Sequence, residues 1–185
     1  WAMKWGDLLR VKAEFPINLW PNAAQAYHRW IRTSIKENKP YDQFARELLT
    51  ESGSNFRVPQ VNFYRAIQSK EPQAIAQAVA LTFMGTRTEN WPEDRCSELA
   101  AFFSRIGFKQ TAEWKEEIVF FDPTRTNVLS RTALFPDGTP VRQKPGAGKR
   151  GVENKAASNT QRTLSDSQWP ARDPREIFAD WLIDP

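Results

Sequence analysis

Helical spacing of apolar side chains, interrupted by proline and glycine, is the feature that most constrains the fold of this chain. Residues three or four apart lie on one face of an α-helix, so each such stretch predicts an amphipathic helix. Proline favours the first turn of a helix and ends a preceding one. The predicted helices cover approximately residues 1–15, 22–37, 41–51, 61–67, 72–84 and 91–106. The pattern therefore predicts a mainly α domain of about five helices besides the short stretch at 61–67.

Aromatic residues are expected to form much of the core. The 185 residues include 8 Trp and 12 Phe. A buried aromatic side chain removes roughly 150–250 Å² from water, so each buried Trp contributes on the order of 4–6 kcal/mol as an upper bound. We expect five aromatic residues of the helical stripes to meet in one compact body: Trp5, Trp30, Phe44, Phe83 and Phe102.

The periodicity changes after residue 115. Alternating β-branched and aromatic residues at 116–121 predict a strand, and residues 128–135 followed by Pro136, Asp137 and Gly138 predict a hairpin. An isolated hairpin is only marginally stable, so it should pack on the helical body. The predicted organisation is a helical domain at 1–122, a β-hairpin region at 123–142, a basic flexible linker at 143–172 and the start of a second domain at 173–185.

Positive charge is concentrated in one segment. Residues 124–172 hold nine of the 26 basic and three of the 22 acidic residues, which leaves 17 basic and 19 acidic residues elsewhere. A helical nucleic-acid reader normally carries its basic residues on a face that meets phosphates, and the helical region here is balanced. Nucleic-acid or anionic-surface binding is therefore an alternative that would use the basic segment, with Lys144, Lys149 and Arg150 as the contact candidates.

The single histidine and the single cysteine do not form a recognisable site in the sequence. One cysteine excludes an internal disulfide, and no C-x-x-C or Cys/His spacing typical of a metal site occurs. His28 lies beside the apolar stripe of its helix and is interpreted as a polar flank. Cys96 lies among charged residues, and a Cys–His nucleophile would require it to meet His28 in space. We predict no metal ligands and no catalytic residues.

Two further patterns resemble functional motifs and are interpreted otherwise. Residues 146–151 match G-x-G-x-x-G, but no apolar strand precedes them and no helix pattern follows, so we interpret them as linker. The densest carboxylates are Glu113, Glu116, Glu117 and Asp122. Adjacent side chains of a strand point to opposite faces, so Glu116 and Glu117 cannot act together on one glycoside. We interpret these four carboxylates as a solvated edge of the predicted strand.

Several apolar side chains are candidates for intermolecular or interdomain contact. Trp20 and Trp114 fall outside the helical stripes, which makes them candidates for surface contact, for example with a sugar. Asp173 and Pro174 begin a predicted helix whose apolar residues are Phe178, Trp181 and Leu182. We expect this helix to pack against a flanking domain of the same polypeptide or against another subunit. No apolar run is long enough to span a bilayer.

Three segments together resemble a known family. They are WAMKW with DLLR at 1–10, PNA followed by Tyr27, Trp30 and Ile31 at 21–31, and KPYDQF at 39–44. Weaker matches lie at 62–66 and 100–107. The set resembles the cytochrome-associated domain of unknown function found in large secreted proteins of planctomycetes and verrucomicrobia. Residues 173–182 resemble the opening of the second domain of unknown function that follows it.

The resemblance implies a cellular location, and the chain departs from the family pattern at one point. In that family the module follows a c-type cytochrome domain, which implies a periplasmic or extracellular protein. Because the chain starts and stops within helical patterns, we expect it to be part of a longer polypeptide. Many family members carry C-x-x-C-H between segments that correspond to 83–85 and 89–91 here. This chain has only Thr86, Arg87 and Thr88 between them, so the thiols and histidine of covalent haem attachment are missing and no cofactor is expected.

These observations favour a non-catalytic structural or interaction domain of a larger extracytoplasmic multidomain protein. Two alternatives stay open. The chain could belong to an exported polysaccharide-processing or redox enzyme whose active site lies with other domains, or the basic segment could bind an anionic surface or nucleic acid.

Overall fold

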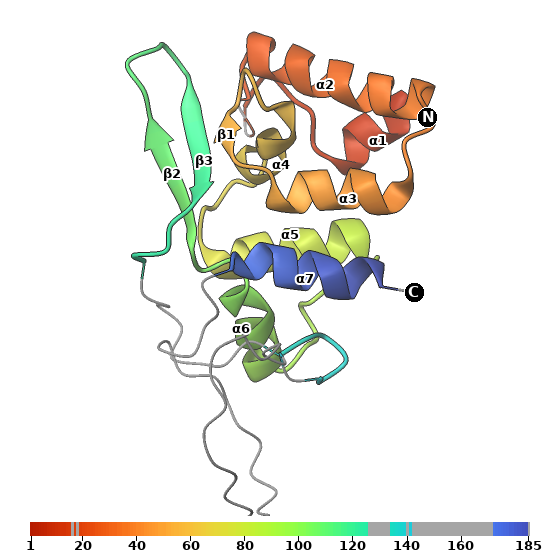
Figure 1. The fold of residues 1–185 in the computed structure, drawn as a ribbon, viewed down its shortest axis with the longest axis vertical. Coiled ribbons are helices and arrows are strands. Elements are labelled where there is room, and N and C mark those ends of the chain that lie inside the picture. Colours follow the sequence, from red (N-terminus) through yellow and green to blue (C-terminus); the bar gives the residue numbers. More distant parts are fainter. Residues whose placement is uncertain (16, 18, 126–133, 140, 142–171, 185) are drawn as a thin grey trace, which may run out of the picture.

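The computed structural model describes residues 1–15, 17, 19–125, 134–139, 141 and 172–184. Its described residues form a mainly α fold, as predicted, and the β part is a small three-stranded antiparallel sheet (Figure 1). In chain order the elements are α1 Ala2–Leu8, α2 Pro21–Lys36, α3 Tyr41–Thr50, β1 Gly53–Ser54, the 3-10 helix η1 Pro59–Val61, α4 Asn62–Arg65, α5 Pro72–Phe83, α6 Glu93–Ala101, β2 Ile106–Gln110, β3 Glu117–Phe121 and α7 Pro174–Ile183.

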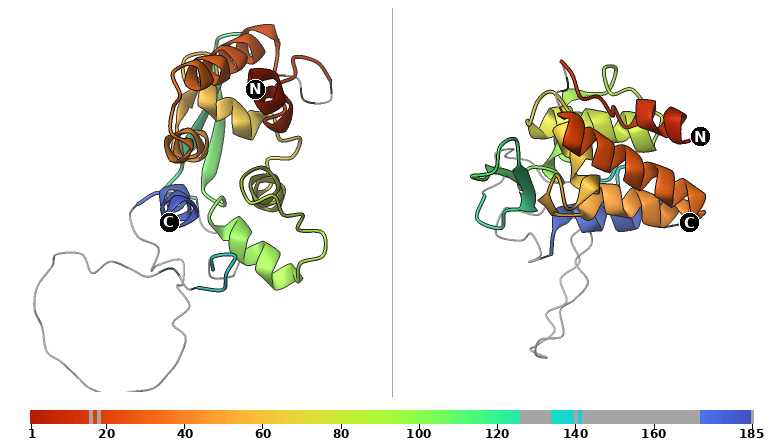
Figure 2. Two further views of the ribbon diagram at one scale, coloured as in Figure 1. Left: turned by 90° about the vertical axis from the view of Figure 1, so that its right-hand side faces the viewer. Right: turned by 90° about the horizontal axis from the view of Figure 1, so that it is seen from above.

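The helices form a body with the sheet along one side (Figure 1). Helix α1 packs on α2, α5 on α6, and α7 on α3 although these last two are far apart in sequence. Figure 2 views α3 and α7 nearly end-on, side by side. The strand order is β1-β3-β2, with Gly107 of β2 opposite Phe120 of β3. A Cβ at Gly107 would lie 2.6 Å from the Phe120 ring, so glycine allows that ring to cover β2.

The predicted aromatic residues meet in one core. Phe44 and Phe102 are buried, and Trp5, Trp30 and Phe83 pack against the same cluster. None of the seven described tryptophans is fully buried, and several pack at the edge of this core. Their size and polar N–H favour the periphery. Trp30 illustrates this: its ring stacks on Phe44 while its Nε1 donates to a carboxylate oxygen of Glu47 at 3.2 Å.

Helix α1 ends much earlier than the sequence predicts, at Leu8 rather than near residue 15. It stops in a Schellman motif, in which Val11 N donates to Gly6 O at 2.9 Å and Arg10 N donates to Asp7 O at 3.1 Å. Arg10 adopts the left-handed conformation that this motif requires, with a φ of 56°. Glycine usually occupies this position, so arginine here is not recognisable in the sequence as the end of a helix.

The predicted helix over 91–106 is also shorter than expected. Helix α6 ends at Ala101, and Ile106–Gln110 forms β2, which pairs with β3 in the observed hairpin. Gly107, which directly follows the predicted helix in the sequence, is therefore a strand residue and not a helix cap. The second predicted β segment covers 128–135, and its residues 128–133 lie outside the described residues. Beyond it the expected turn is present, since Gly138 N donates to Phe135 O at 2.8 Å.

Candidate functional site

The apolar face of α7 is buried in the core of its own chain. Phe178 is 0% exposed, and its ring centroid lies 5.5 Å from that of Phe102 and 5.4 Å from that of Phe103. These two residues directly follow α6. The helix therefore completes the body that the first 121 residues form.

The other two contact candidates on α7 lie at the rim of this interface. Trp181 stacks on Phe135 with ring centroids 5.2 Å apart, and its Nε1 donates to Asp137 Oδ2 at 3.2 Å. Leu182 is partly buried and packs against the same core. Of the three predicted residues, Phe178 is fully used by contacts inside the chain, and the other two are partly used.

Arg175 is the charged residue that fixes α7 to α3. Its side chain is 1% exposed. Its guanidinium donates to both carboxylate oxygens of Asp173, at 2.6–3.2 Å, to Glu51 O at 3.2 Å and to Ser52 Oγ at 2.9 Å. The Tyr64 ring lies beneath it, 5.8 Å from its Cζ. Because Glu51 and Ser52 follow α3, this network ties the start of α7 to the end of α3.

A partly exposed ion-pair network also joins α3 and α7. Arg46 of α3 donates to Asp180 of α7 at 2.6 Å, and Arg172 lies 2.7 Å from the same carboxylate. Partial desolvation raises the pKa of Asp180, but the hydrogen bonds from Arg46 and Arg172 outweigh it and lower that pKa overall. The side chains of Arg46 and Asp180 are 37% and 43% exposed, so this pair stabilises the interface only slightly.

Trp20 and Trp114, the two predicted surface tryptophans, lie together although they are distant in sequence. Their ring centroids are 5.3 Å apart, and Lys115 Nζ lies 4.3 Å from the Trp20 ring centroid. Trp114 is 74% exposed at the tip of the β2–β3 hairpin. Trp20 has φ 67° and ψ 153°, a backbone conformation that residues other than glycine rarely adopt. Their role in contacts with a partner stays a prediction.

Buried Asn55 holds the hairpin tip that carries Trp114. Its Nδ2 donates to Lys115 O at 3.2 Å, and its Oδ1 accepts from Glu117 N at 2.9 Å. Glu116 adds a second tie, because it accepts a hydrogen bond of 2.5 Å from Ser54 Oγ. This bond, with another from the Thr111 hydroxyl, lowers the pKa of Glu116.

The carboxylates of this region do not form one solvated edge, which corrects the prediction for Glu117. Glu117 is 8% exposed, pairs with Arg65 at 3.1 Å and also contacts Lys70. Glu116 has different partners, in keeping with the expectation that the two neighbours cannot act together. Glu113 is exposed and Asp122 is partly exposed.

His28 and Cys96 lie on different elements. His28 is a partly exposed residue of α2, and Cys96 is on α6, where its thiol donates to Thr88 O at 3.6 Å. Covalent c-type haem attachment needs two thiols and a histidine in one short motif. The single cysteine and single histidine of this chain do not fit such a group.

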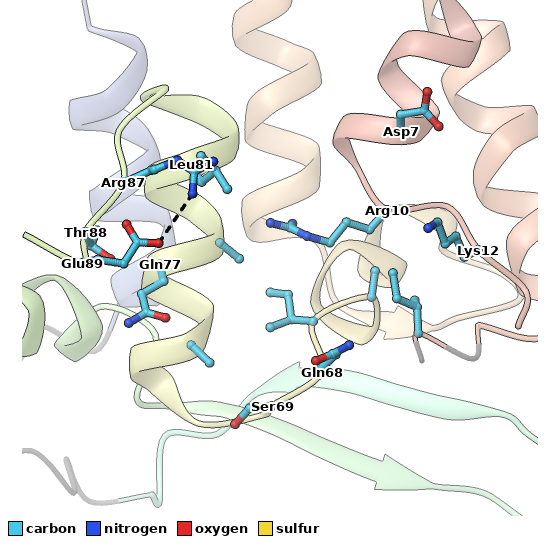
Figure 3. Close-up of a pocket in the computed structure, with 15 residues that line it drawn as sticks. Asp7, Arg10, Lys12, Gln68, Ser69, Gln77, Leu81, Arg87, Thr88 and Glu89 are labelled. Carbon is cyan, nitrogen blue, oxygen red and sulfur yellow. Dashed lines mark ion pairs between the residues drawn. The ribbon is translucent and has the colours of Figure 1, made fainter. Parts of the chain in front are cut away.

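A cavity of about 580 Å³ lies between the segment that follows α1 and the α5 side of the body (Figure 3). We call it the Arg10 cavity. Arg10 reaches into it from the α1 side, and its Nη1 is buried without a hydrogen-bond partner among the described residues. Its lining consists of Asp7, Arg10, Lys12, Ile17, Ala66, Ile67, Gln68, Ser69, Ala74, Gln77, Ala78, Leu81, Arg87, Thr88 and Glu89. No motif in the sequence indicated this site.

Other predictions concern parts that the structure does not describe. Lys144, Lys149 and Arg150 lie outside the described residues, as does the 146–151 glycine motif. Within the described ranges, no helix combines the length and apolarity needed to cross a bilayer. The same ranges contain no group of three or more His, Cys, Asp or Glu side chains suited to hold a metal ion.

Comparison with known families shows to which family the chain belongs. The sequence profile of PSCyt2, described as a protein of unknown function (DUF1549), matches residues 1–106, more than half of the sequence. The chain belongs to the PSCyt2 family. Comparisons with curated proteins and with solved structures gave no match. The PSCyt2 match ends at the start of β2, so β3 and α7 lie beyond it.

Proposed function

We propose that this PSCyt2 chain is a non-catalytic structural domain that holds the following part of its polypeptide through α7, within a larger extracytoplasmic multidomain protein. The observation that carries the proposal is the burial of Phe178 and Arg175 in the body formed by the matched region. The extracytoplasmic context, a preceding c-type cytochrome domain and a following second domain come from the family resemblance described above. In this proposal α7 is the first element of that second domain.

Burial at the α7 interface favours a fixed attachment over a loose tether. Domains of one chain usually move relative to each other unless their interface is large and apolar. Here the ring of Phe178 is buried in the core. The buried guanidinium of Arg175 also donates hydrogen bonds to Asp173 at the start of α7 and to Glu51 and Ser52 after α3. Moving α7 away would separate the buried guanidinium from its partners after α3, and breaking such a buried ionic network is strongly destabilising. The network therefore restricts α7 to one position. A domain that follows α7 would inherit this orientation.

Cleavage of the full chain between α7 and the body tests the proposal. A protease site is inserted within residues 142–171, and the cleaved protein is examined by gel filtration and mass spectrometry at micromolar concentration. We expect the fragment that carries α7 to stay bound to the body. The matched variants are Phe178→Ala, which should release the fragment, and Trp1→Ala, whose side chain is 83% exposed and which should retain it. Release of the fragment from the otherwise unchanged protein would contradict the proposal.

A further inference from the structure

We propose that the Arg10 cavity binds a small organic monocarboxylate with an apolar body, and that the guanidinium of Arg10 pairs with its carboxylate. This inference goes beyond the docking role of α7. It rests on different residues, between the α1 side and α5, so either proposal can fail without the other.

The first observation is a buried guanidinium nitrogen without a partner, on a residue that lines a cavity. Arg10 Nη1 is shielded from solvent and has no hydrogen-bond partner among the described residues, and Figure 3 shows the side chain extending across the cavity from the α1 side. A buried donor without an acceptor is costly, and the cost is higher for a charged group. Arg10 as a whole is partly exposed and lines the cavity, where a carboxylate would supply two acceptors whose geometry matches the donors of a guanidinium.

The protein itself offers Arg10 no anionic partner among its described groups. The Tyr27 hydroxyl interacts electrostatically with Arg10, but it is buried without a hydrogen-bond partner of its own. Burial raises the pKa of Tyr27 well above its ordinary value of 10.0, so this phenol stays neutral. Asp7 also lines the cavity, yet no ion pair joins it to Arg10. An exogenous anion is therefore the group that would complete the site.

The backbone gives a second observation. Arg10 occupies the left-handed position of the Schellman motif at the end of α1, with φ 56°. Glycine suits this position best, because a Cβ makes the left-handed conformation unfavourable. The helix end thus provides no reason for arginine, and the role of this residue lies in its side chain. The left-handed position also means that the substitution Arg10→Gly removes the cation without disfavouring the fold.

The lining indicates the class of ligand. Three basic and two acidic described residues line the cavity, which leaves one net positive charge and fits a monoanion better than a polyphosphate. On α5, Ala74, Ala78 and Leu81 are spaced along one helical face and form an apolar wall. A volume of about 580 Å³ lies within the range of small-molecule sites. A carboxylate with a short hydrocarbon body meets all three conditions.

Titration of the full chain with hexanoate tests the inference, with hexanamide and inorganic phosphate as comparison probes. Binding is followed by isothermal calorimetry and by NMR shifts of the Arg10 side chain and the Ala74 and Ala78 methyl groups. We expect hexanoate to bind at submillimolar concentration and hexanamide at least about tenfold more weakly, because the amide cannot form the charge-assisted pair. Equal binding of hexanamide, tighter binding of phosphate, or no hexanoate binding would overturn the proposal.

Two variants locate the site. Arg10→Gly should weaken hexanoate binding at least about tenfold while its unfolding midpoint does not fall below that of the unchanged protein. Lys4→Gln removes the same charge from the exposed face of α1, outside the cavity lining, and should leave binding unaltered. Equal loss in both variants would show general charge attraction, and unaltered binding in Arg10→Gly would place the ligand elsewhere. Either result overturns the assignment.

Discussion

Replacing Arg175 by methionine should destabilise the protein far more than the same replacement at Arg46, although both remove a cation from the α3–α7 interface. Arg175 is 1% exposed and donates to Asp173, Ser52 and Glu51. Loss of one partner from such a buried network costs about 3–5 kcal/mol. Methionine keeps the apolar stem and Asp173 retains its cap bond from the residue 175 amide, so we expect about 3 kcal/mol, near the lower end.

The comparison with Arg46→Met separates burial from ion pairing. The Arg46–Asp180 pair is 37% and 43% exposed, so its loss should cost only about 0.5 kcal/mol. The assay is urea unfolding followed by tryptophan fluorescence and circular dichroism. With a denaturant slope of about 2 kcal/mol per molar, the midpoint should fall by about 1.5 M for Arg175→Met and by about 0.25 M for Arg46→Met. Equal shifts in the two variants would refute the argument from burial.

Two further predictions concern the hairpin tip. Asn55→Ala should lower the free energy of unfolding by about 2–3 kcal/mol, measured by urea unfolding, because it leaves Lys115 O and Glu117 N without their partner. An NMR titration should place the pKa of Glu116 below its ordinary value of 4.5, and Ser54→Ala should raise it again. Because that pKa is lowered in the folded protein, the stabilisation by Glu116 is complete above pH 4.5 and is lost as the pH falls through the lowered value. An unshifted titration would contradict the hydrogen bond from Ser54.

Periodicity predicted the helical elements well because burial selects apolar residues at fixed spacing. The stripe positions Phe44 and Phe102 are buried as expected, and α7 presents Phe178 to the core. The periodicity did not predict the structure where a backbone conformation or strand pairing, and not the burial of one helix face, decides it. The end of α1 depends on Arg10 in a position that glycine normally occupies, and β2 depends on its pairing with β3, the next strand along the chain. Neither is encoded in the local pattern.

The candidate sites depend on contacts between segments that are far apart in sequence. Trp20 and Trp114 were singled out because they interrupt the stripes, and their proximity appears only in the fold. Arg175 carried a usable signal: it lies three residues before Phe178, on the apolar side of its helix, where a charge must find partners. Arg10 carried none, since its importance depends on a cavity wall formed by α5.

Hydrogen exchange measured at single amides tests the central claim, that α7 is part of the core of the PSCyt2 body. The amides of Phe178 in α7 and Val79 in α5 both belong to residues that are 0% exposed. If α7 is fixed as described, both amides should exchange only through opening of the whole domain and show similar protection. Exchange at Phe178 as fast as in a free peptide, with Val79 still protected, would show that α7 is not held by the body.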